Sequence, residues 1–72
     1  MTNGEVKSLA VAYDEELNRN RQLLVEYNRM PPESGWFGKA VLTELISRAE
    51  KAARDGDVVA MVAIYAQLQE SA

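Results

Sequence analysis

Residues 55–66 read D-G-D-V-V-A-M-V-A-I-Y-A, and this stretch decides the fold. Gly56 suits the left-handed position just after a helix, and Asp57 suits the N-cap of the next helix. From Val58 to Ala66 there is no charged residue, so the helix that starts here requires burial on most of its sides. Because short connections place consecutive helices side by side, the stretch predicts an antiparallel helical hairpin whose second helix spans about 58–70.

The first helix of this hairpin follows a proline break. Met30-Pro31-Pro32 cannot continue a helix, because proline lacks the amide donor and disfavours the helical conformation of the residue before it. The new helix begins either at Pro32 or with Ser34 as its cap, and its range is about 34–54. Its apolar seam consists of Leu42, Leu45, Ala49 and Ala52.

A long helix at about 3–28 precedes the break. Thr2 and Glu5 are spaced as a capping box, which satisfies two free amides at a helix start. The residues that follow at alternating steps of four and three form a heptad seam: Val6, Ala10, Tyr13, Leu17, Asn20, Leu24 and Tyr27. At 1.5 Å per residue this helix would be about 38 Å long. Residues 1–72 thus predict one all-α domain, with a long N-terminal helix followed by the antiparallel hairpin.

Composition argues against several functional classes. The 72 residues contain no cysteine and no histidine, which argues against disulfides, zinc sites and the usual general base near neutral pH. Eight Lys and Arg stand against eleven Asp and Glu, whereas a nucleic-acid-binding protein normally has a basic surface. No apolar run approaches the ~20 residues that span a bilayer, and no signal peptide is visible. We therefore expect a cytoplasmic protein that binds neither nucleic acid nor membrane.

No group of side chains favours catalysis. Asp14-Glu15-Glu16 is the densest carboxylate cluster, but consecutive residues on a helix point to different sides, which is typical of a solvated face. Asp55 and Asp57 lack the remaining ligand positions of a calcium loop. We expect no enzyme, and no cofactor, metal or small-molecule ligand.

Helices of these unequal lengths predict self-association. A long first helix on a shorter hairpin leaves part of its seam uncovered, and exposed apolar patches on small proteins usually mark interfaces. The prediction is a two-fold helical-bundle homodimer. Asn20 either sets the register of this contact or lies at a solvated edge, and the sequence favours neither. The candidate dimer-interface residues are Tyr13, Leu17, Asn20, Leu24, Val59 and Val62.

Aromatic residues bracket the proline turn, and arginines lie along the first helix. Tyr and Trp are enriched at the energetic centres of interfaces, but the same side chains could close the end of the helical core. The arginines could meet an acidic partner or belong to a solvated face. The candidate partner-binding residues are Arg19, Arg21, Tyr27, Met30, Trp36 and Phe37.

Ala49 to Leu68 reads A-x-x-A-A-x-x-G-D-x-x-A-x-x-x-x-Y-x-x-L. This pattern is similar to the turn and second helix of a tetratricopeptide-type hairpin, although no 34-residue repeat is present. The resemblance implies an adaptor or assembly subunit that binds a peptide or its own copies.

A second resemblance covers three stretches. They are V-K-S-L-A-V-A-Y-D-E-E-L-N-R-N-R-Q-L-L (Val6 to Leu24), G-W-F-G (Gly35 to Gly38) and R-A-E-K-A-A-R-D-G-D-V-V-A-M (Arg48 to Met61). Together they resemble the quorum-sensing anti-activators of Mu-like transposable phages. The resemblance implies a compact helical dimer without catalytic activity that binds a host quorum-sensing transcription activator and keeps it from DNA. It also implies the type IV pilus assembly ATPase as a further partner, and it identifies no individual contact residue.

Overall fold

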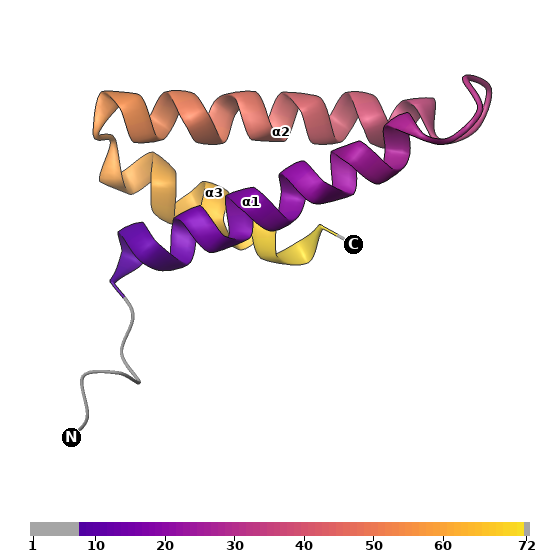
Figure 1. The fold of residues 1–72 in the computed structure, drawn as a ribbon. Coiled ribbons are helices and arrows are strands. Elements are labelled where there is room, and N and C mark those ends of the chain that lie inside the picture. The colour runs from indigo at the N-terminus through magenta and orange to yellow at the C-terminus, as the bar shows by residue number, and fades with distance from the viewer. Residues whose placement is uncertain (1–7, 72) are drawn as a thin grey trace.

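The computed structural model describes residues 8–71, which form three α-helices and no strand. α1 spans Leu9–Asn28, α2 spans Trp36–Asp55 and α3 spans Val58–Glu70, and each helix contacts the other two. In Figure 1, α3 starts below the C-terminal end of α2, while α1 crosses in front of α3 and rises toward the start of α2. The all-helical prediction is confirmed. Within these residues, no helix has the length and hydropathy that crossing a membrane requires.

α1 starts later than the sequence suggested, because Ser8 caps it. Ser8 is extended (φ −67°, ψ 158°), and its hydroxyl accepts a hydrogen bond of 3.2 Å from the Val11 amide. Serine is a strong N-cap because its oxygen replaces the missing helical acceptor. The capping box expected at Thr2 and Glu5 lies outside the described residues. With 20 residues α1 is about 30 Å long, compared with the expected length of about 38 Å.

α2 begins at neither of the two expected positions. The Ser34 amide donates to the Pro31 carbonyl over 2.9 Å, so residues 31–34 form a turn. Gly35 then takes the left-handed conformation (φ 72°) as the N-cap, without a side-chain cap, and the helix starts at Trp36. The left-handed conformation suits glycine, which has no Cβ to clash with the backbone. The chain therefore needs one more residue to re-enter a helix than the cap pattern suggested.

The connection between α2 and α3 confirms the two caps predicted at Gly56 and Asp57. Gly56 is left-handed (φ 67°), and its amide donates to the Ala53 carbonyl over 3.2 Å. The Asp57 carboxylate accepts from the Ala60 amide over 3.1 Å, as an N-cap does. The C-terminal end of α2 and the N-terminal end of α3 are thus both capped by the two residues between them.

The core lies where the three helices meet. It consists of Tyr13, Leu17, Leu42, Leu45, Ile46, Ala49, Ala52, Ile64 and Leu68. The Tyr13 hydroxyl donates to the Ala49 carbonyl over 2.8 Å, and burial raises the pKa of Tyr13. Fully buried Ala49 allows α1 to approach α2 closely enough for this hydrogen bond.

Candidate protein-binding surface

Four apolar side chains are exposed next to the proline turn, and we call them the turn patch: Met30, Trp36, Phe37 and Val41. Trp36 and Phe37 are 65% and 68% exposed, although they are the only tryptophan and the only phenylalanine of the chain. Their rings meet edge to face, with centroids 6.0 Å apart and planes at 86°. Val41 follows Phe37 by one helical turn, so the two lie on the same side of α2. The turn patch therefore consists of four exposed apolar side chains around the proline turn and the first turns of α2.

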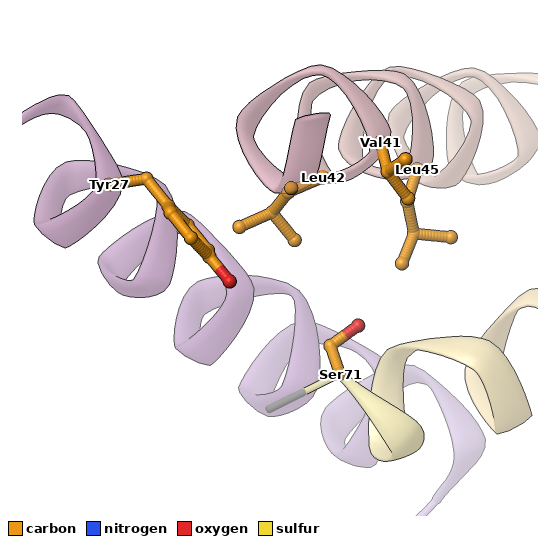
Figure 2. A pocket seen from close by; sticks show the side chains of 6 residues that line it. Tyr27, Val41, Leu42, Leu45 and Ser71 are labelled. Atoms are coloured by element: carbon orange, nitrogen blue, oxygen red, sulfur yellow. The ribbon is translucent and has the colours of Figure 1, made fainter. Parts of the chain in front are cut away.

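A hollow of about 170 Å³ adjoins the turn patch. The hollow exists because α3 ends at Glu70, whereas α1 and α2 extend farther toward the proline turn (Figure 1). The lining residues are Tyr27, Gly38, Val41, Leu42, Leu45 and Ser71. In Figure 2, Leu42 and Leu45 extend from α2 toward the space between the helices, and the Tyr27 hydroxyl faces it from α1. The expectation that a long first helix leaves part of its seam uncovered is not met at Tyr13, Leu17 and Asn20, which are buried, and α1 is no longer than α2. Tyr27, the last residue of that seam, borders the hollow.

The structure brings together four of the six candidate partner-binding residues. Tyr27 is half-buried, and Met30, Trp36 and Phe37 are exposed around the same turn. The Sδ atom of Met30 and the ring of Tyr27 both lie against Gly35. The interpretation of these side chains as a plug for the core fits Tyr27 alone, because the other three project into solvent.

The two candidate arginines have partners within the chain. Arg19 donates hydrogen bonds to the carbonyls of Leu68 (2.6 Å) and Ser71 (3.0 Å). These hydrogen bonds pair carbonyl groups at the C-terminal end of α3. Arg21 forms an ion pair of 2.7 Å with Glu50 of α2. Each guanidinium therefore holds α1 against another helix.

The candidate dimer-interface residues separate into two groups. Tyr13, Leu17 and Asn20 are buried inside the single chain, and Leu24 is half-buried against the core. By contrast, Val59 is 82% exposed and Val62 is 55% exposed. Together with exposed Val58 they form what we call the valine face of α3.

Asn20 does not lie at a solvated edge, because no part of it is exposed. Its Nδ2 atom donates to the carbonyls of Glu16 (2.7 Å) and Leu68 (3.1 Å), so Asn20 fixes a contact between α1 and α3. The Oδ1 atom of Asn20 is buried and has no hydrogen-bond partner among the described residues.

Sequence reasoning missed Val41 and Val58 as surface residues. The spacing of Phe37 and Val41 is a signal for Val41, because residues four apart share one side of a helix. The exposure of Val58 has no such signal, since Val58 begins an apolar run that continues to Ala66 without a charged residue.

Comparison with known proteins adds no relative: no family model, no curated protein and no solved structure matches the chain. Within residues 8–71, no three acidic, histidine or cysteine side chains are grouped as metal ligands would be. The candidate binding features of the described surface are therefore the turn patch and the valine face, which are apolar and aromatic.

Proposed function

We propose that this protein acts by binding another protein through the turn patch. The observation that carries the proposal is the exposure of Trp36 and Phe37, 65% and 68%, in a chain with one residue of each kind. A small domain gains most of its stability by burying such side chains, so exposure of both at one place favours an interface. Trp side chains are also among the commonest energetic centres of binding.

The proposed partner is a host quorum-sensing transcription activator, whose binding to DNA the protein would block. The resemblance of the sequence to phage anti-activators supports this partner, as does the net charge of −3. An acidic protein suits the basic surface of a DNA-binding domain. We propose that the protein acts in the cytoplasm of a bacterial host, with the type IV pilus assembly ATPase as a further target.

We also propose a two-fold homodimer formed through the valine face. The exposed side chains of Val58, Val59 and Val62 support it, because they lie close together on α3 and each is more than half exposed. Sedimentation equilibrium at micromolar concentration should give twice the mass of one chain, and Val59→Lys should give a monomer. The control is Val11→Lys, which places the same charge at an exposed valine of α1 and should leave the dimer intact. A monomeric wild-type protein would remove this part of the proposal.

The second candidate is a helical adaptor built on a tetratricopeptide-like antiparallel hairpin. Burial of Ala49 and Ala52 in α2 favours it, because small residues at these positions let helices approach closely. An adaptor of this kind would assemble with its own copies or with an extended peptide, and it would show no affinity for the activator.

The test of the proposed function is a calorimetric titration of the purified activator. Truncation of a central interface side chain removes at least about 2 kcal/mol, so Trp36→Ala and Phe37→Ala should each weaken binding about 30-fold. Val25→Ala is the matched control, because Val25 is an exposed apolar residue of α1 outside the turn patch. It should change the affinity by less than about threefold. The proposal fails if the activator does not bind, or if both aromatic variants bind as tightly as the control.

A further inference from the structure

The ring of Tyr27 packs directly on the backbone of α2 at two glycines. A Cβ atom on Gly38 would lie 3.2 Å from Cε1, Cζ and Oη of Tyr27. On Gly35, it would lie 3.2 Å from Cδ1 of Tyr27 and 3.0 Å from Sδ of Met30. Carbon atoms in ordinary contact are about 3.5–4.0 Å apart, so a side chain at either position would displace the ring or the helix.

The two glycines that Tyr27 contacts flank the exposed aromatic residues in the sequence. Trp36 and Phe37 are the only residues between Gly35 and Gly38, and all four belong to the first turn of α2 and its cap. The Lys39 amide closes this turn by donating to the Gly35 carbonyl over 2.8 Å. The backbone that carries both aromatic side chains is therefore held against α1 at each end by one tyrosine ring.

We infer that Tyr27 is a positioning residue, whose ring sets the direction in which Trp36 and Phe37 project. The inference rests on the proposed function, because a fixed direction matters only if the turn patch binds a partner. Binding surfaces that are ordered in the free protein lose less conformational freedom when the complex forms. We expect the ring to carry most of this role, since the ring contacts both glycines, whereas Oη contacts only Gly38 among the two and makes no hydrogen bond within residues 8–71.

The experiment measures the order of Trp36 in the free protein. Because Trp36 is the only tryptophan, its time-resolved fluorescence anisotropy reports on the turn patch alone. Tyr27→Ala should at least double the amplitude of the sub-nanosecond depolarisation, whereas Tyr27→Phe should leave it unchanged. Leu24→Ala is the matched control, since Leu24 is half-buried one turn earlier on α1. It should lower the unfolding temperature and leave the Trp36 anisotropy as in the wild type.

Gly38→Ala is the second variant, and it keeps the ring while inserting a methyl group against it. Although alanine favours helices over glycine, we expect a lower unfolding temperature and a changed Trp36 anisotropy. The inference is overturned if Tyr27→Ala and Gly38→Ala both leave the anisotropy unchanged, or if Leu24→Ala changes it equally. If Tyr27→Ala does not fold, Gly38→Ala alone decides.

Titration of the activator separates this inference from the proposed function. Tyr27→Ala should weaken binding about as much as Trp36→Ala, and Tyr27→Phe should bind like the wild type. If Trp36→Ala binds normally, the proposed function fails, while the anisotropy still tests the role of Tyr27. If Trp36→Ala binds weakly and Tyr27→Ala binds normally, the positioning role fails and the proposed function stands.

Discussion

Replacement of Asn20 by leucine should leave the protein as stable as the wild type, or slightly more stable. Asn20 is fully buried, and leucine has a similar volume without polar atoms. The change removes the hydrogen bonds from Nδ2 to the carbonyls of Glu16 and Leu68. It also removes Oδ1, which is buried without a hydrogen-bond partner among the described residues.

The opposing contributions are similar in size. Two hydrogen bonds contribute about 1 kcal/mol each, so their loss should destabilise the fold by about 2 kcal/mol. Relief of an unpaired buried oxygen should return about 1–3 kcal/mol. Neither carbonyl is left unpaired, because Leu68 keeps its 2.6 Å hydrogen bond from Arg19 and the Glu16 carbonyl keeps its bond within α1. We therefore expect the free energy of unfolding to change by less than about 1 kcal/mol.

The assay is urea unfolding followed by circular dichroism, with thermal unfolding as a second measurement. A change of 1 kcal/mol in a domain of this size corresponds to about 4–8 °C in the unfolding temperature. Asn18→Leu is the control for helix propensity, since Asn18 is an exposed residue of α1, and it also removes the 2.7 Å hydrogen bond that Asn18 Oδ1 accepts from Arg21. A loss of about 2 kcal/mol or more in Asn20→Leu would contradict this expectation, because it would show that the two hydrogen bonds outweigh the unpaired oxygen.

Two further predictions concern Tyr13 and Gly56. Burial raises the pKa of Tyr13, so above pH ~10 the unfolded chain releases a proton that the folded chain retains, and stability falls by up to about 1.4 kcal/mol per pH unit. Alkaline unfolding of Tyr13→Phe should lack this contribution, and an unchanged slope would contradict it. Gly56→Ala should destabilise the fold by about 1–2 kcal/mol in urea unfolding, because a φ of 67° is strained for alanine. No atom lies within 4 Å of the added methyl group, so the backbone strain is the whole cost. A neutral effect would mean that the turn relaxes.

Sequence reasoning succeeded where the cause acts within a few residues. Pro31 and Pro32 end a helix by their own chemistry, and Gly56 and Asp57 close two helix ends through neighbouring amides. It was wrong at the start of α2, because the conformation of Gly35 depends on how the turn before it closes. A cap residue indicates that a helix begins nearby, but several such residues compete for the same role.

The roles of Arg19 and Asn20 depend on contacts between distant segments. Both bind the Leu68 carbonyl, which lies 49 and 48 residues away in the sequence. A heptad seam shows that one stripe of α1 is buried, but it does not say whether α3 or a second copy covers that stripe. The candidate site follows the same division: the aromatic residues near the proline turn are visible in the sequence, whereas their exposure and the hollow depend on how the three helices pack.

The most direct test of the central claim is a nuclear magnetic resonance titration of isotope-labelled protein with the purified activator. If the activator binds at the turn patch, the indole N–H signal of Trp36 and the amides of residues 35–41 should shift most, while those of α3 around Val59 should shift little. Contradiction would come from an unperturbed Trp36 indole at saturating activator, or from larger shifts on α3 than at the turn patch.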